Sequence, residues 1–387
     1  MNITTAHRID TVKEYYFSRK LREIALLNEQ NKQVINLGIG SPDLTPDNTI
    51  IDALIGSAQN PKNHSYQSYK GILALRNAIS NWYNKIYHVG LAPEKEILPL
   101  LGSKEGIMHI SMTYINPGDE VLIPDPSYPT YVAATNLAGG KVVKYKLSES
   151  EEWHPNIENL ATLITKKTKL IWINYPNMPT GKQANLKLLA GLLDLARKHN
   201  ILVCNDNPYS LTLNDKPTSI FQIENAIDIA LELNSLSKSH NMAGWRLGWV
   251  AGNEQRINEI LKFKSNMDSG MFLPIQHAAI TALNADKFSY ENNNKIYAQR
   301  RKLAWELLDV LGCTYDKNQV GMFVWAKIPQ SLTNSSTYSD MILNNTYVFI
   351  TPGSIFGEQG TQYLRISLCN DKAIMNEAIN RIKKMMV

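Results

Sequence analysis

The sequence is poor in cysteine. Its 387 residues contain only three, Cys204, Cys313 and Cys369, and these share no close spacing. Disulfide frameworks and cysteine-based metal sites need paired or grouped thiols, so both are excluded. The sequence thus predicts a protein without a bound metal in a reducing compartment, and we expect a cytoplasmic location.

Long apolar runs and blocks of one charge are also missing. No run approaches the roughly 18 apolar residues of a membrane helix. The N-terminus, MNITTAHRIDTVKEYYF, lacks the basic-then-apolar layout of a signal peptide. The 40 basic and 35 acidic residues are mixed along the chain, so the net charge of +5 forms no nucleic-acid footprint. Neither a membrane nor a nucleic-acid partner is expected.

What the chain does contain is an alternation of two patterns. Short apolar runs, rich in β-branched residues, lie between stretches with apolar residues at helical spacing, which predicts a mostly parallel α/β sheet. We expect this large domain over residues 47–275 and a smaller α+β domain made of 1–46 with 276–387. The expected helices are 13–28, 73–86, 184–198, 290–311 and 371–386; the expected strands include 120–124, 170–173, 200–204, 227–233, 322–327, 347–350 and 363–368.

One lysine directly follows the apolar run 227–233. Lys238 is flanked by Ser235 and Ser237, and Arg246 stands eight residues on. Two hydroxyls and a guanidinium suit a buried phosphate, and burial beside cations makes a lysine nucleophilic toward carbonyl groups. A solvated loop lysine is the alternative. A Ser-x-x-Lys hydrolase motif is excluded, because its S-D-N and K-T-G partners are absent.

Polar groups follow other strands too. Asp206 comes after the run 200–204, where a carboxylate can pair with a protonated pyridine nitrogen, and Tyr209 can offer its hydroxyl to a ring oxygen. Ser103 and Lys104 begin a helical stretch whose backbone N–H groups can bind phosphate. Tyr128 can stack on a planar cofactor. The structural alternatives are a helix cap for Asp206 and a turn with core aromatics for Tyr128.

Two further residues can bind a substrate carboxylate. Gly40 ends an apolar run with a bend that allows close backbone approach. Arg365 lies in an alternating strand, where it either pairs structurally or binds a carboxylate in a bidentate manner.

In order and spacing these motifs resemble the class I/II aminotransferases of pyridoxal 5′-phosphate (PLP) fold type I, from Ile35 to Leu368. The block from Ser235 to Gly248 is similar to the family's S-x-S-K-x-x-x-x-x-G-x-R-x-G motif. The resemblance implies a large domain with a mostly parallel seven-stranded sheet, a smaller α+β domain, and a homodimer with shared sites.

The resemblance also implies roles for individual residues. Lys238 would hold PLP as a Schiff base and move protons, Asp206 would pair with the pyridinium nitrogen, and Tyr209 would bond the ring oxygen. Tyr128 would stack on the ring, and Gly40 and Arg365 would bind the substrate's α-carboxylate. The phosphate would be held by Ser103, Lys104 (through its backbone N–H), Ser235, Ser237, Arg246 and, from the neighbouring subunit, Tyr66.

One position departs from the family pattern. The family has Asn immediately before Pro-Thr-Gly, where its amide bonds the ring oxygen, and this chain has Met178. A thioether sulfur cannot donate a hydrogen bond. Either Asn177 or Asn174 takes over this role, or Tyr209 bonds the oxygen alone.

The expected reaction is transamination between an L-amino acid and a 2-oxo acid by a ping-pong mechanism. The same residues would serve a PLP-dependent C–S β-lyase, which shares every step through loss of the α-proton. A non-catalytic PLP-fold regulatory module is a third reading. The segments near Tyr15–Phe17 and Gly270–Phe272 either line the substrate pocket or belong to the core.

Overall fold

The computed structural model describes residues 3–286 and 288–386, and its main feature is a seven-stranded sheet. Six strands run in one direction and β8 runs against them. The predicted mostly parallel seven-stranded sheet is thereby confirmed. The strand order is β2 (Ile97–Leu100), β8 (Gly248–Ala251), β7 (Ala230–Ser235), β6 (Leu202–Asp206), β5 (Thr168–Ile173), β3 (Glu120–Asp125) and β4 (Lys141–Lys146).

Helices cover both faces of this sheet because its central strands are apolar on both sides. In β5, Leu170 and Trp172 pack into one core with α5 (Ser103–Tyr114), α6 (Thr130–Leu137) and α10 (Glu254–Lys264). The alternate residues Ile171 and Ile173 pack into another with α7 (Ile157–Leu163) and α8 (Leu186–His199). Alternation along each strand thus places its side chains in two layers.

A third core lies beyond the β2 edge. There α3 (Asn48–Ala58), α4 (Leu73–Tyr87) and α11 (Leu273–Asn284) pack together with Trp249 of β8. Helix α11 continues across residue 276, where the sequence suggests a domain junction, and its Ala278 and Ala282 belong to this core. The division into 47–275 and 1–46 with 276–387 stays a prediction. Helix α11 packs with α3 and α4, which belong to the larger part of that division.

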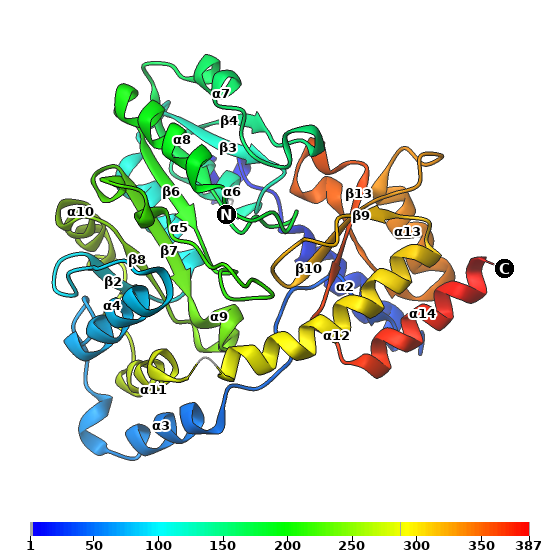
Figure 1. The fold of residues 1–387 in the computed structure, drawn as a ribbon, viewed down its shortest axis with the longest axis horizontal. Coiled ribbons are helices and arrows are strands. Elements are labelled where there is room, and N and C mark those ends of the chain that lie inside the picture. The colour runs from blue at the N-terminus through cyan, green and yellow to red at the C-terminus, as the bar shows by residue number, and fades with distance from the viewer. Residues whose placement is uncertain (1–2, 287, 387) are drawn as a thin grey trace.

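The C-terminal part forms a second, smaller layered unit. Its four-stranded antiparallel sheet has the order β12 (Thr351–Pro352), β13 (Tyr363–Ser367), β10 (Phe323–Lys327), β9 (Thr314–Tyr315). It packs with α12 (Phe288–Val310), α13 (Ser335–Thr346) and α14 (Lys372–Met386). In Figure 1 this unit, orange to red, stands beside the green and cyan sheet, and yellow α12 leads from one to the other.

The N-terminal segment packs against the smaller unit. Strand β1 (Ile35–Asn36) pairs in parallel with β11 (Val348–Phe349), and Ile24 of α2 (Tyr16–Glu29) packs on Leu343 and Phe349. Blue α2 accordingly lies among the orange and red elements in Figure 1. No helix within the described ranges has both the length and the apolarity needed to cross a membrane.

Candidate active site

A cavity of about 580 Å³ opens where the carboxyl ends of β3, β5, β6 and β7 meet the smaller unit and the N-terminal segment. Every predicted site residue lines it except Asn177 and Tyr66. Its walls are Tyr15, Phe17, Ser18, Leu21, Ile39, Gly40, Ser103, Lys104, Tyr128, Tyr131, Asn174, Met178, Asp206, Pro208, Tyr209, Ser235, Ser237, Lys238, Ala243, Arg246, Phe323, Phe356 and Arg365.

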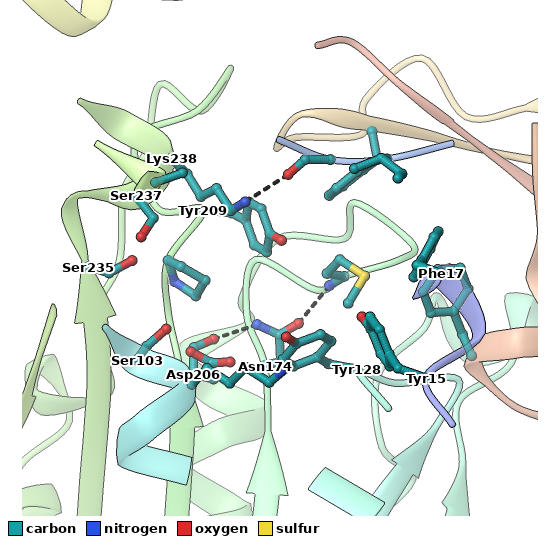
Figure 2. Close-up of a pocket in the computed structure, with 18 of the residues that line it drawn as sticks. Tyr15, Phe17, Ser103, Tyr128, Asn174, Asp206, Tyr209, Ser235, Ser237 and Lys238 are labelled. Carbon is teal, nitrogen blue, oxygen red and sulfur yellow. Dashed lines mark hydrogen bonds between the residues drawn. The ribbon is translucent and has the colours of Figure 1, made fainter. Parts of the chain in front are cut away.

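Lys238 projects into this cavity from the short helix α9 (Leu236–Ser239), which follows β7 directly. Its Nζ donates a hydrogen bond to the carbonyl oxygen of Gly40 at 2.8 Å, drawn as a dashed line in Figure 2. Burial lowers the pKa of the Lys238 ammonium to about 8, and the positive charges of Arg365 and Arg246 act in the same direction. An appreciable fraction of the amine is therefore neutral near neutral pH.

Asp206 lies at the end of β6 with one carboxylate oxygen unsatisfied. Its Oδ2 accepts a hydrogen bond from the Tyr131 hydroxyl at 2.8 Å, whereas its buried Oδ1 has no partner among the described residues. Burial raises the pKa of Asp206 to about 6, against the lowering effect of Tyr131. A buried carboxylate oxygen without a donor is costly, so this site is built for a cationic or N–H partner.

One wall of the cavity gathers donors suited to an anion. The hydroxyls of Ser103, Ser235 and Ser237 face the same space in Figure 2. Arg246 borders it, donating through Nη1 to the carbonyl of Ala243 at 2.9 Å. A Cβ at Gly102, which has φ +91°, would lie 2.2 Å from Arg246 Nη2, so only glycine lets this guanidinium reach the start of α5.

Arg365 of β13 forms a second anion-binding group. It is 4% exposed and forms no salt bridge with the described residues. Its Nη2 donates to the Gly38 carbonyl at 2.8 Å, and its Nη1 contacts the Met178 sulfur at 3.2 Å. The rings of Phe323 and Phe356 lie 3.9 and 4.6 Å from its Cζ. Burial lowers the pKa of Arg365 to about 10, and an incoming carboxylate would supply the missing counter-charge.

The Met178 region shows which side chains are available in place of the usual asparagine. Asn177 is buried outside the lining, where its Oδ1 accepts from the Thr180 hydroxyl at 2.7 Å and its Nδ2 donates to the Asn174 carbonyl. Asn174 does line the cavity, but its amide bonds the Asp206 carbonyl and the Met178 N–H. Of the side chains considered for the hydrogen bond to the ring oxygen, Tyr209 is the one left with a hydroxyl to donate. Its ring packs against Phe323.

Tyr66 lies away from this cavity and is 90% exposed. That placement is compatible with the predicted role in a neighbouring subunit, which stays a prediction. Phe272, of the segment considered for the pocket, is also exposed, while Met271 is buried in the core with α4 and α11.

Sequence reasoning assigned no role to Phe323 and Phe356, which surround Arg365. For the segment Tyr15–Phe17 it left two places open, the substrate pocket or the core; Tyr15 and Phe17 line the cavity, whereas Tyr16 does not. Tyr131, which anchors Asp206, stacks on Trp172 at 5.0 Å. The sequence feature that could have identified Tyr131 is its position three residues after Tyr128, at the start of α6. The other rings come from distant segments that only the fold brings together.

One cluster of described side chains outside the cavity carries atoms that can bind a metal ion. Glu105, His109 and Asp268 place potential ligand atoms within 4.8 Å of one another. The buried Lys264 ammonium is already paired with Asp268, so a cationic group occupies this cluster.

The cavity thus brings together a lysine of lowered pKa, a buried aspartate, hydroxyl donors at a helix start and an arginine without a salt bridge among the described residues. The family model "Aminotransferase class I and II" matches residues 32–382. The chain therefore belongs to the class I and II aminotransferases. It is a PLP-dependent enzyme that transfers an amino group between an L-amino acid and a 2-oxo acid.

Known proteins resemble the chain over nearly its whole length. It is 39% identical to the LL-diaminopimelate aminotransferase of Moorella thermoacetica, covering 98% of both chains. The substrate-bound structure of BacF from Bacillus subtilis matches with a TM-score of 0.95 and 33% identity, over 100% of this chain and 98% of that one. An aromatic aminotransferase from Pyrococcus horikoshii matches with a TM-score of 0.86 and 31% identity, over 94% and 98%.

Proposed function

We propose that Lys238 is the residue that binds PLP and moves the protons of transamination. The observation that carries this proposal is that one cavity is lined both by Lys238, whose pKa is about 8, and by Asp206, whose buried Oδ1 has no partner among the described residues. The first supplies a reactive amine, and the second a carboxylate for a ring N–H.

The other lining residues fit the rest of the cofactor. The hydroxyls of Ser103, Ser235 and Ser237 with the Arg246 guanidinium would hold its phosphate, together with the backbone N–H groups of Ser103 and Lys104. Tyr128 would cover the ring, and the Tyr209 hydroxyl would bond the ring oxygen. When bound, PLP supplies an electron-withdrawing ring that stabilises negative charge at the substrate's α-carbon.

Each protein group then has a task at a stated atom. Arg365 has an unpartnered Nε and would orient the substrate by its α-carboxylate, beside the Gly40 backbone. Lys238 Nζ would hold the cofactor and, as an amine of lowered pKa, would carry the proton taken from the substrate's α-carbon. The Gly40 carbonyl orients Nζ, and the buried rings of Phe323 and Phe356 restrict water.

The proposed enzyme is a homodimer in which Tyr66 reaches the phosphate of the other subunit. Support comes from large apolar and aromatic side chains that are exposed around the N-terminal end of α4, namely Tyr66, Tyr69, Leu73 and Phe272. Gly270 lies against the backbone of Gln67, where a Cβ would be 2.6 Å from the carbonyl oxygen, so the two segments of this patch are in close contact. Large exposed apolar side chains gathered in one place mark interaction surfaces.

Borohydride reduction of the holoenzyme followed by peptide mapping tests the central assignment. The cofactor mass is expected on Lys238, and its appearance on another lysine would overturn the proposal. A panel of amino donors with 2-oxoglutarate then tests the reaction. The names of the Moorella and Pyrococcus relatives place LL-diaminopimelate and aromatic amino acids in that panel. Release of pyruvate and ammonia from cystathionine, without amino transfer, would favour the β-lyase.

A further inference from the structure

The buried carboxylate of Asp125 joins the large sheet to the segment of the smaller unit that precedes β13. Asp125 is the last residue of β3 and is 3% exposed. Its Oδ2 accepts a hydrogen bond from the N–H of Glu358, and its Oδ1 accepts one from the N–H of Gln359, both at 3.1 Å. Bonds from N–H groups to an ionised carboxylate are among the stronger hydrogen bonds in proteins. Asp125 therefore fixes two consecutive backbone groups to the end of β3.

Two further contacts hold the same stretch, residues 356–359, against β3. The N–H of Ser127 donates to the carbonyl oxygen of Phe356 at 2.8 Å. Gly357 has φ +144°, and a Cβ there would overlap Asp125 Oδ1. A side chain at this position would be excluded both by the backbone angle and by the carboxylate. The sequence thus provides a glycine where the segment comes closest to Asp125.

Phe356 carries the effect of this attachment into the cavity. Its ring lines the cavity, is 5% exposed and lies 4.6 Å from Arg365 Cζ. The Phe323 ring covers the same guanidinium at 3.9 Å. Rings over a guanidinium attract its charge and shield it from water, while its N–H edge stays free for a carboxylate. If Phe356 were displaced, water would reach Arg365 and the carboxylate would bind less tightly.

The stretch of chain that begins with Asp125 also serves the cofactor side of the cavity. Tyr128, three residues on, lines the cavity, and Tyr131 donates to Asp206 Oδ2 at 2.8 Å. Residues 125–131 therefore connect the groups expected at the cofactor ring with the ring that covers Arg365. This connection would keep the substrate-binding arginine in a fixed place relative to the reacting groups.

We propose that Asp125 is a positioning residue for substrate binding. By fixing residues 356–359 to the end of β3, its carboxylate holds the Phe356 ring against Arg365, and so sets the affinity of Arg365 for the substrate's α-carboxylate. This inference rests on the proposed function, which gives Arg365 that role.

Asp125→Asn, in the holoenzyme, tests the proposal while keeping the size of the side chain. The amide nitrogen cannot accept a hydrogen bond, so one of the two backbone N–H groups loses its partner. The KM for 2-oxoglutarate should rise ~10-fold, with kcat changed by less than ~3-fold, because Lys238 and Asp206 are untouched. The Kd for PLP, measured by fluorescence titration, should stay within ~3-fold of wild type, since the phosphate-binding groups are also unchanged.

Lys144→Met is the matched control. Lys144 contacts Asp125 as well, from Nζ to Oδ2 at 3.0 Å, but its side chain is 44% exposed. An exposed ion pair contributes little, and the variant keeps the carboxylate and its two backbone bonds. K144M should therefore leave the KM for 2-oxoglutarate within ~2-fold of wild type. Equal rises in D125N and K144M would overturn the proposal, because the backbone bonds would then not carry the effect.

A double-mutant cycle shows whether Asp125 acts through Phe356. Phe356→Leu alone should raise the KM for 2-oxoglutarate by a factor similar to that of D125N. The double variant D125N/F356L should bind no more weakly than the more impaired single variant, since both changes remove the same contact with Arg365. Effects that multiply in the double variant would mean that Asp125 does not act through this ring.

Gly357→Ala approaches the same contact from the other side and serves if D125N does not fold. Its methyl group would push residues 356–359 away from Asp125, so the KM should rise as in D125N. Gly191→Ala in α8, where a Cβ meets nothing within 4 Å, is its control and should leave the KM unchanged.

The outcomes separate this inference from the proposed function. An active wild-type enzyme whose D125N variant is less stable to urea, but has an unchanged KM, would reduce Asp125 to a structural role and overturn this inference alone. A wild-type holoenzyme that transfers no amino group to any 2-oxo acid would overturn the proposed function, and this inference with it.

Discussion

The unpaired Oδ1 of Asp206 makes the apoenzyme less stable above pH 6. The pKa is raised from 3.8 to about 6 in the folded chain, so folding favours the protonated carboxyl, and the stabilisation is lost as the pH rises through 6. In apoenzyme, Asp206→Asn should therefore increase the free energy of unfolding at pH 8 by up to about 3 kcal/mol.

Urea denaturation of cofactor-free protein at pH 8 and pH 5 checks this prediction. The advantage of D206N should shrink at pH 5, where more of the wild-type carboxyl is protonated. Tyr131 can still donate to the amide oxygen, so its hydrogen bond is kept in the variant. An apo D206N protein no more stable than wild type at pH 8 would argue that Oδ1 has found a donor.

The lack of a hydrogen-bond donor at Met178 can be tested by a pH titration of the bound cofactor's absorbance. An amide at this position can donate a hydrogen bond to the ring oxygen, which a thioether cannot. Met178→Asn is expected to lower the pKa of the holoenzyme's absorbance titration by about one pH unit, the worth of one hydrogen bond. Tyr209→Phe, which removes the remaining donor, should shift it upward. An M178N titration identical to wild type would mean that the new amide points elsewhere, for instance toward Arg365.

At the scale of elements, the junction of β2 and α5 depends on the absence of a side chain at Gly102. Gly102→Ala would place a Cβ against Arg246 at a backbone φ that favours glycine. The Kd for PLP should rise ~10-fold or more, measured by fluorescence titration, because the guanidinium loses its place beside the anion site. Gly56→Ala in α3, where a Cβ meets nothing within 4 Å, is the matched control and should leave PLP binding unchanged.

The elements also show how far sequence patterns reach. Helices 73–86 and 184–198 were predicted within two residues of α4 and α8, because their apolar stripes follow helical spacing closely. The strand predicted at 227–233 begins only at Ala230, since Ala226–Asp228 form a 3₁₀ turn after Asn225 at φ 56°. Most of the candidate site follows strand ends and was therefore visible in the sequence. For the segment Tyr15–Phe17 the sequence left pocket and core open, because the place of α2 depends on its packing on Leu343 and Phe349, far along the chain.

At the scale of the whole molecule, shared sites in a homodimer predict complementation between inactive subunits. In the proposed homodimer, Lys238→Ala and Tyr66→Ala would each impair every site of their own dimer. A mixed dimer has one site with both Lys238 and Tyr66 intact. Mixing the unfolded variants and refolding them together should restore up to about a quarter of wild-type activity, since half the dimers are mixed and each has one intact site of two.

Sedimentation analysis of each preparation confirms that dimers have formed, and refolding each variant alone is the control. Activity that stays at the level of the separate variants would place Tyr66 outside the partner's site. The same result with a monomeric sedimentation coefficient would reject the dimer itself.

The wall formed by Tyr15, Phe17 and Leu21 belongs to a different part of the chain from the chemistry. Lys238 follows one strand of the large sheet and Asp206 ends another, whereas these side chains belong to α2 and the residue before it, outside every strand of that sheet. Substitutions there can retune substrate preference while the reacting groups and the main core stay intact. During evolution, substitutions in α2 could therefore change the substrate preference of such an enzyme without disturbing its reacting groups. For the same reason α2 is the first segment to exchange when such an enzyme is redesigned.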